Sequence, residues 1–187
     1  IHTVRQRNQL HQRTQLPFCM VVMGLSAFPV CETLLLQSSL FSNCFVSSDG
    51  GNIFTSFYGE ATLILFLPGL PWMLLQNRYD QHYDQRFGSR KMAFRRVVFG
   101  HATQLICLAI FLIVLARQSD GASETSAHIA LVWCFLLIGV GSSTVYGTHA
   151  QVISIFDEKF HPYFFIGTYS VSWVIAPLNL ATGELCD

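Results

Sequence analysis

Residues 139–167 read GVGSSTVYGTHAQVISIFDEKFHPYFFIG, and they continue without a break from the apolar run IALVWCFLLI at 129–138. The apolar run is typical of a helix in contact with lipid, but the sequence after it becomes small and polar. It then passes through a charged segment, DEKFHP at 157–162, and becomes aromatic again. The stretch therefore predicts two membrane helices joined by a tight turn, the first of which carries polar groups at membrane depth.

The composition agrees with a membrane environment. Of the 187 residues, 51% are hydrophobic and 12% are charged, and the mean hydropathy is +0.42. Soluble domains carry about 25% charged residues, so half that share indicates lipid as the solvent. The net charge is zero, which removes any bulk electrostatic attraction to nucleic acid, and we expect no nucleic-acid partner.

Enzymatic chemistry has no support in the motifs. The six cysteines lie mostly in apolar runs without a CxxC pair, so we expect small buried hydrophobes and neither a disulfide framework nor a zinc site. No Ser-His-Asp arrangement, phosphate loop or metal-ligand cluster is found. We therefore expect a protein that is not an enzyme, with no cofactor and no metal. The chain begins at Ile1 and ends with TGELCD at 182–187, which suggests a piece of a longer protein.

Five segments approach the roughly 20 apolar residues that a membrane-spanning helix needs. Helices are expected because unsatisfied backbone groups in hydrocarbon cost several kcal/mol each. The sequence thus predicts an all-α polytopic bundle over 16–187, preceded by a cytosolic segment at 1–15. The expected spans are 16–41, 54–76, 97–116, 127–156 and 162–181.

The basic residues predict an orientation. The segment 77–96 contains six Lys and Arg residues, and Arg5, Arg7 and Arg13 precede the first span. The segment 42–52 contains none. Because basic residues collect on the cytosolic side, we expect the N-terminus and the 77–96 loop in the cytosol. The membrane is the plasma membrane or an endomembrane.

Several polar side chains fall inside the expected spans: Glu32, Glu60, His101, Gln104 and His149. An ionisable group at that depth costs about 2.5–3.5 kcal/mol, so it usually faces a cavity or a partner. Glu32 and Glu60 are candidates for proton coupling. His101 is expected near the cytosolic interface, and His149 either lines a cavity or hydrogen-bonds a neighbouring helix.

The fourth span has two distinct faces. Gly139, Ser143 and Gly147 recur every four residues, which is typical of close helix packing. Ser142, Tyr146 and His149 form a polar strip on another face. Helix packing alone needs no such strip, so a bundle around a polar cavity is favoured. Kinks are expected at Pro29, Pro68 and Pro71.

The spacing of Gly139, Gly147 and Gly167, with EKF at 158–160 between the last two, resembles the equilibrative nucleoside transporter family. RRVVFG at 95–100 resembles the start of that family's third helix, and Phe57 and Pro68 match a Phe and a Pro eleven residues apart. Two departures stand out. Tyr146 occupies a position where members often have Gln, and Val30-Cys31 replaces Trp-Asn.

The resemblance implies a fold like that of the major facilitator superfamily, with this chain as the first five of eleven spans and the C-terminal helices missing. It implies facilitative transport of nucleosides or similar small polar solutes by alternating access. Gly139, Ser143, Gly147 and Gly167 would pack or slide helices. The expected solute-binding residues are Tyr146, Ser142, Val30, Phe66 and Thr148.

Two alternatives remain open. DQRFGSRK at 84–91 resembles the Asp-Arg-x-Gly-Arg-Lys loop of the major facilitator superfamily, so the chain is alternatively a transporter of another solute. A non-transporting membrane subunit derived from a transporter is the other reading.

Overall fold

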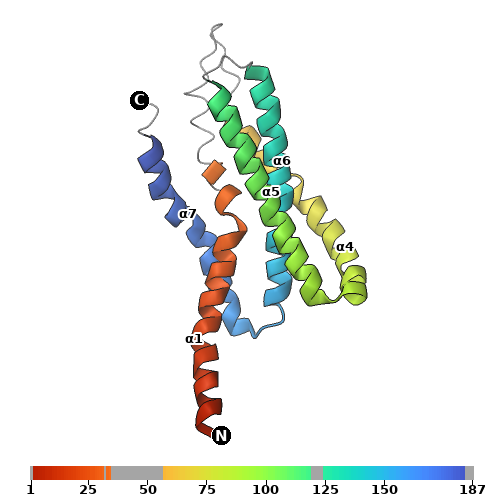
Figure 1. The fold of residues 1–187 in the computed structure, drawn as a ribbon, viewed down its shortest axis with the longest axis vertical. Coiled ribbons are helices and arrows are strands. Elements are labelled where there is room, and N and C mark those ends of the chain that lie inside the picture. The colour runs from red at the N-terminus through yellow and green to blue at the C-terminus, as the bar shows by residue number, and fades with distance from the viewer. Residues whose placement is uncertain (1, 32, 35–56, 119–123, 184–187) are drawn as a thin grey trace.

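The computed structural model describes residues 2–31, 33–34, 57–118 and 124–183. Every element among them is a helix, which confirms the expected all-α class (Figure 1). The elements are α1 (His2–Ala27), α3 (Phe57–Phe66), α4 (Gly69–Phe87), α5 (Ser89–Gln118), α6 (Glu124–Ile153), the 3₁₀ turn η2 (Glu158–Phe160) and α7 (His161–Gly183).

Among the described residues, two helices are long and apolar enough to cross a membrane. They contain the segments Ser89–Val114 in α5 and Thr125–Ile153 in α6, with mean hydropathies of 2.3 and 1.9. Gln15–Cys31 is a shorter apolar helix. These two segments include most of the third and fourth expected spans. The membrane crossing of the other three expected spans stays a prediction.

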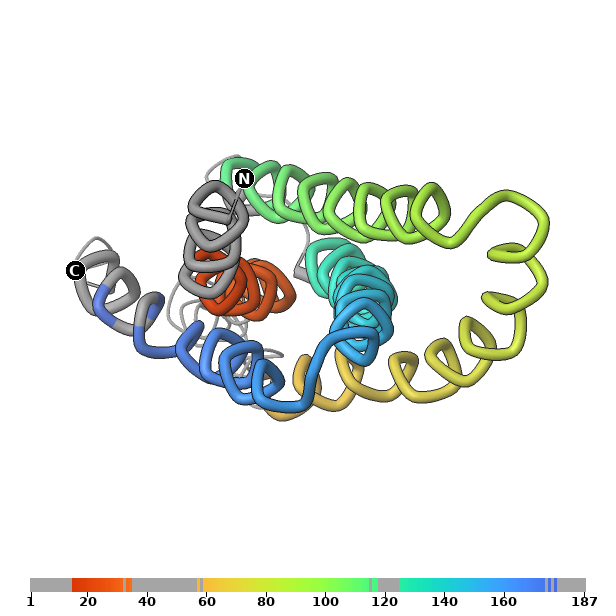
Figure 2. Tube along the Cα trace, turned by 90° about the horizontal axis from the view of Figure 1, so that it is seen from below, coloured from red at the N-terminus to blue at the C-terminus, as the bar shows by residue number. Residues whose placement is uncertain are grey.

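Helix α6 lies in the middle of the described bundle. Seen along the bundle in Figure 2, α5 covers one side of α6, and α3 and α4 cover the opposite side. Helix α1 packs mainly against α7 and less extensively against α6. The turn at Gly88 and the turn at 154–160 lie at the same end of the molecule as the N-terminus (Figure 1).

The second expected span, 54–76, is broken into two helices. Residues 54–56 lie outside the described residues, α3 ends at Phe66, and α4 begins at Gly69. Pro68 has no N–H and its ring clashes with the preceding turn, so the regular helix is disrupted at this point. Pro71 falls in the first turn of α4, where a missing N–H costs nothing. The expected kink is therefore a break of two residues, across which Leu67 N–H still donates to the Leu63 carbonyl and Trp72 N–H to the Pro68 carbonyl.

The prediction of a connecting loop at 77–96 is wrong, because these residues are almost entirely helical. Helix α4 continues to Phe87, α5 begins at Ser89, and Gly88 alone separates them. Gly88 has a φ of +88°, a conformation that L side chains rarely adopt, and its N–H donates to the Asp84 carbonyl at 2.9 Å. Arg, Lys and Gln are good helix formers, so this polar sequence extends both helices.

The first expected span begins within a longer helix. Helix α1 starts at His2 and therefore runs through the segment 1–15 that was expected to precede the bundle. The backbone bends at Phe28, next to Pro29, and is helical again over 29–31. Glu32 and 35–41, which belong to this expected span, lie outside the described residues.

Three helix crossings depend on glycine because a Cβ atom would collide with the backbone of the neighbouring helix. A Cβ on Gly100 would lie 2.7 Å from the Gly141 carbonyl oxygen, where α5 crosses α6. A Cβ on Gly167 would collide with the Val21 carbonyl where α7 crosses α1, and one on Gly139 would collide with the Leu65 carbonyl of α3. Such close approach allows helices to pack without a hydrophobic driving force between them.

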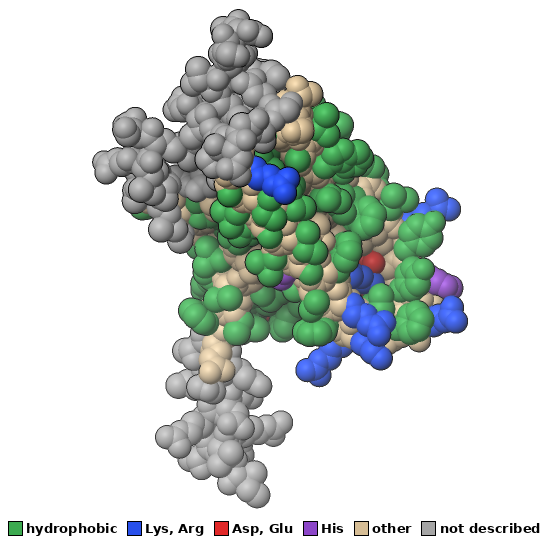
Figure 3. Space-filling view, turned by 45° about the horizontal axis from the view of Figure 1, so that its top comes forward, with side chains coloured by type: hydrophobic (Ala, Val, Ile, Leu, Met, Phe, Trp, Pro, Cys, Tyr) green, Lys and Arg blue, Asp and Glu red, His purple; other side chains and the backbone are tan. Residues whose placement is uncertain are grey.

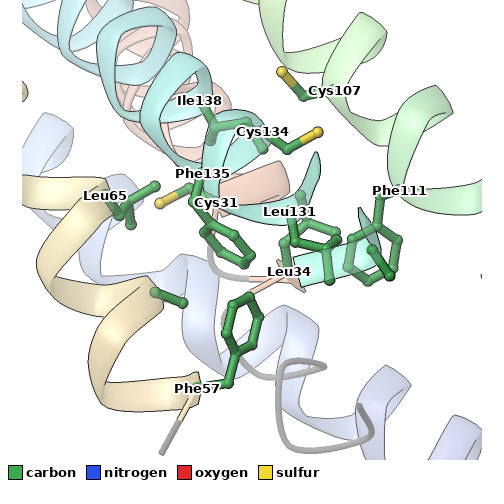
Figure 4. Packing of buried hydrophobic residues seen from close by; sticks show 12 residues of the cluster. Cys31, Leu34, Phe57, Leu65, Cys107, Phe111, Leu131, Cys134, Phe135 and Ile138 are labelled. Carbon is green, nitrogen blue, oxygen red and sulfur yellow. The ribbon is translucent and has the colours of Figure 1, made fainter. Parts of the chain in front are cut away.

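The main apolar core lies where α3, α5 and α6 meet Cys31 and Leu34, which follow α1 (Figure 4). The rings of Phe57 and Phe135 meet edge to face, with centroids 5.7 Å apart. The cluster consists of Cys31, Leu34, Phe57, Ala61, Leu65, Cys107, Phe111, Ala127, Leu131, Cys134, Phe135 and Ile138. Three of the cysteines thus behave as the expected buried hydrophobes, whereas Cys19 is exposed.

Candidate functional site

The polar strip on α6 faces α1, α5 and α7. We call the contact between Ser142, Tyr146 and His149 and these three helices the seam. Gln104 of α5 donates from Nε2 to Ser142 Oγ at 2.9 Å and to the Ala27 carbonyl at 3.3 Å. Gln104 is buried and holds three helices together at one point.

Aromatic rings close the middle of the seam. The Tyr146 ring lies 5.4 Å from Phe28, which directly follows α1, and 5.7 Å from Phe164 of α7, measured between centroids. These separations are typical of favourable aromatic pairs. Phe28 and Phe164 therefore cover part of Tyr146, which is half-buried in this conformation.

His149 completes the strip one turn further on. It is buried, its ring meets Phe164 edge to face, and it hydrogen-bonds the backbone of Met23. Its Nδ1 atom is buried without a hydrogen-bond partner in the described part of the chain. An unsatisfied buried polar atom costs about 1–3 kcal/mol, so this atom is one that a polar ligand would satisfy.

A second polar face of α6 meets α4, and we call it the ladder. Trp72 Nε1 donates to Thr144 Oγ1 at 2.7 Å, and Gln76 Nε2 donates to Thr148 Oγ1 at 3.3 Å. One turn further, Gln151 Nε2 donates to Asp80 Oδ2 at 2.7 Å. The contacts repeat because residues four apart lie on one face of each helix.

An arginine from α5 closes the ladder at the Gly88 end. Arg96 Nη2 lies 2.8 Å from Asp80 Oδ1 and 2.5 Å from Asp84 Oδ1, and its Nη1 donates to Gln151 Oε1 at 3.4 Å. The Arg96 and Asp80 side chains are each only 10% exposed. Two carboxylates therefore share one guanidinium, and α4, α5 and α6 are joined by a single charged cluster.

Sequence reasoning overlooked this cluster. The signal was present, because Trp72, Gln76, Asp80 and Asp84 recur every four residues along α4. Trp72 and Gln76 belong to the expected second span, whereas Asp80 and Asp84 fall in the expected loop at 77–96, where that spacing has no meaning. Once 77–87 is helical, the four side chains fall on one face.

The expected solute-binding residues do not come together. Ser142 and Tyr146 share the seam, whereas Thr148 is buried in the ladder. Val30 packs against the main apolar core, and Phe66 is 59% exposed on α3. Helix rotation explains the split between Tyr146 and Thr148, since positions two apart on a helix point in different directions.

The small residues of α6 and α7 lie at helix contacts. Gly139 and Ser143 face α3 and the start of α4, where Ser143 Oγ lies against Gly69. Gly147 lies beside the Gln76 side chain with ordinary spacing, and Gly167 faces α1.

An acid–histidine pair lies toward the opposite end of α6 from the ladder. Glu60 Oε2 of α3 lies 3.1 Å from His128 Nε2 of α6, and the two side chains are 39% and 20% exposed. The other proton-coupling candidate, Glu32, is outside the described residues. No group of three or more His, Cys, Asp or Glu side chains in the described residues could hold a metal ion.

Comparisons of this chain with protein-family models, with curated proteins and with solved structures found no match. The site therefore has to be interpreted from its own geometry.

Proposed function

We propose that this chain is part of a membrane transporter that moves a nucleoside or a similar small polar solute by alternating access. The observation that carries the proposal is the seam, where a helix apolar enough to cross a membrane buries Ser142 and His149 and half-buries Tyr146 against neighbouring helices. A membrane anchor has no need of such groups, because polar side chains at membrane depth are costly.

The packing supports a seam that opens. Helices α1 and α7 pack mainly on one another, while α5 packs mainly on α6, and the contact between α1 and α6 is smaller. Separation of the α1–α7 pair from α6 would move Phe28 and Phe164 away from Tyr146. The uncovered Tyr146 ring would stack on a base, and His149 Nδ1 would gain a polar partner.

The outer surface supports placement in lipid. Many large apolar side chains are exposed on α5, including Phe94, Val98, Leu105, Ile106, Leu112 and Ile113. Contiguous apolar surface of this kind is rare on soluble monomers and marks contact with a membrane or another protein. With N-terminus, Gly88 turn and 154–160 turn at one end, we assign that end to the cytosol.

The proposal is tested by uptake into proteoliposomes that contain the protein at its full natural length. Labelled uridine and adenosine are supplied outside, and protein-free vesicles set the background. We expect saturable uptake, and for Tyr146→Leu a rise in KM of about fivefold because the base loses its stacking partner. Tyr169→Leu is the matched control, since Tyr169 is 75% exposed on α7.

Each outcome bears on a stated part of the proposal. Uptake at the background level for nucleosides and for other polar solutes would leave a non-transporting subunit as the function. Uptake of another polar solute, without uptake of nucleosides, would support the transport function but exclude nucleosides as the solute. Equal changes of KM in Tyr146→Leu and Tyr169→Leu would show that the seam does not line the solute path.

Proton coupling is a second element of the proposal, and the Glu60–His128 pair supports it. Glu60 Oε2 of α3 lies 3.1 Å from His128 Nε2 of α6, and acidic and histidine side chains at membrane depth are the groups that carry protons in transporters. We expect an inward proton gradient to accelerate uptake by the parent protein and not by Glu60→Gln. An identical response of the parent and Glu60→Gln to the gradient would exclude this pair as the coupling site.

A further inference from the structure

A pocket of about 470 Å³ lies between α4 and α5, floored by α6 at Thr144. Its walls carry four aromatic side chains and two arginines, namely Trp72, Tyr79, Tyr83, Phe99, Arg95 and Arg96. The pocket lies on the outer side of the ladder, and none of its lining residues belongs to the seam. Its contents are therefore separate from the solute path proposed above.

The segment 77–96, which supplies much of the pocket wall, is positively charged because it holds six Lys and Arg residues and two acidic ones. Both acidic residues of the segment 77–96, Asp80 and Asp84, are bound to Arg96. Arg95 is exposed at the pocket, and none of the ion pairs of the described residues includes it. Figure 3 shows basic side chains gathered at this end of the molecule around a small acidic patch. The pocket therefore attracts an anion.

The walls of the pocket also require an apolar occupant. Tyr79 and Phe99 are 54% and 52% exposed, and Leu75, which also lines the pocket, is 48% exposed. A small soluble anion would leave this apolar surface uncovered. Trp and Tyr side chains prefer the headgroup level of a bilayer, where one side of the ring is apolar and the other is wet.

We propose that this pocket binds the headgroup of an anionic phospholipid, with the acyl chains lying along the apolar surface of α4 and α5. The phosphate would meet Arg95, while Trp72, Tyr79 and Phe99 would contact the glycerol region. Basic residues at the cytosolic end of membrane helices bind acidic lipids in this way. The site requires a bilayer but no particular solute, so loss of the nucleoside proposal leaves it intact.

The test uses Trp72 as the reporter. Trp133 and Trp173 are 59% and 83% exposed, so Trp133→Phe and Trp173→Phe leave Trp72 as the only tryptophan of this chain. The variant is placed in nanodiscs with brominated phosphatidylglycerol or brominated phosphatidylcholine in a background of unlabelled phosphatidylcholine. Brominated chains quench tryptophan on contact, and we expect the anionic lipid to quench Trp72 at several-fold lower mole fraction.

Two arginine variants distinguish lipid binding in the pocket from a general attraction of anionic lipid to the basic end of the protein. Arg95→Gln should weaken the preference for phosphatidylglycerol about fivefold, as expected for one basic residue at an anionic surface. Arg90→Gln removes an equal charge outside the pocket and should change the preference for phosphatidylglycerol much less. Equal losses in the two variants, or equal quenching by both lipids in the parent, would overturn the proposal. Full competition by millimolar glycerol phosphate would also overturn it, because a soluble anion would then be the ligand.

Discussion

Arg96 of α5 and Asp80 of α4 form an ion pair with 2.8 Å between Nη2 and Oδ1, and each side chain is only 10% exposed. Removing one partner of such a pair leaves a charge without compensation in a poorly solvated place. Here the loss is larger than for a single pair, because Asp84 uses the same guanidinium.

We therefore expect Arg96→Gln to destabilise the protein by about 3 kcal/mol or more, since two carboxylates would then repel one another without a cation. Thermal unfolding of the detergent-solubilised protein measures the effect. Arg90→Gln is the control and should change stability by less than about 0.5 kcal/mol, because Arg90 is exposed. A comparable loss in both variants would mean that the buried cluster contributes nothing.

Two glycine variants should have opposite effects. A Cβ at Gly167 would collide with the Val21 carbonyl, whereas one at Gly59 meets nothing within 4 Å. Gly167→Ala should separate α1 from α7 and cost about 1–3 kcal/mol. Gly59→Ala should instead be neutral or stabilise by up to about 1 kcal/mol, because alanine is the better helix former. Melting temperatures of the two variants check this prediction. A higher melting temperature for Gly167→Ala would contradict the close contact between α7 and α1.

The hydrogen bond between Gln104 and Ser142 should be measurable as a coupling energy. Interhelical hydrogen bonds in membrane proteins contribute about 0.6 kcal/mol on average and up to about 1.7 kcal/mol. A double-mutant cycle with Gln104→Leu and Ser142→Ala should give a coupling in that range, since Nε2 lies 2.9 Å from Oγ. Additive single effects would show that the two side chains are independent in the protein.

The orientation can be tested with single added cysteines. Arg90→Cys lies just after Gly88, and Ser154→Cys lies in the exposed turn before η2. We expect both to react with membrane-impermeant maleimide-polyethylene glycol only from the cytosolic side, as one mass shift beyond that of the parent chain. Labelling of the two positions from opposite sides would contradict the expected alternation of the spans.

The 154–160 turn is suited to this test because its charges lie in water. Lys159 Nζ lies 2.5 Å from Asp157 Oδ2, and the side chains are 66% and 57% exposed. The hydrogen bond from Lys159 lowers the pKa of Asp157, which therefore stays ionised over the labelling range. An exposed pair of this kind contributes little to stability, so changes in the turn should not disturb the bundle.

Local sequence is sufficient for the helical class, for the two apolar segments in α5 and α6, and for the small residues at 139, 143 and 167 that lie at helix contacts. These features follow from composition, from the absence of strand patterns and from spacing along one helix. The interruption at Pro68 was expected as a kink for the same local reason, the missing N–H of proline.

The partners of the polar groups depend on contacts between helices. Tyr146 and Thr148 are two residues apart, yet one faces Phe28 and Phe164 and the other faces Gln76. Which face of α6 meets α1 and which meets α4 depends on how the helices rotate and cross, and the close approaches at Gly100, Gly139 and Gly141 set that rotation. Likewise, Asp80 and Arg96 are distant in sequence and become an ion pair only because Gly88 turns α5 back along α4. A side chain has a defined direction only once its helix is docked, so the seam, the ladder and the pocket belong to the tertiary structure.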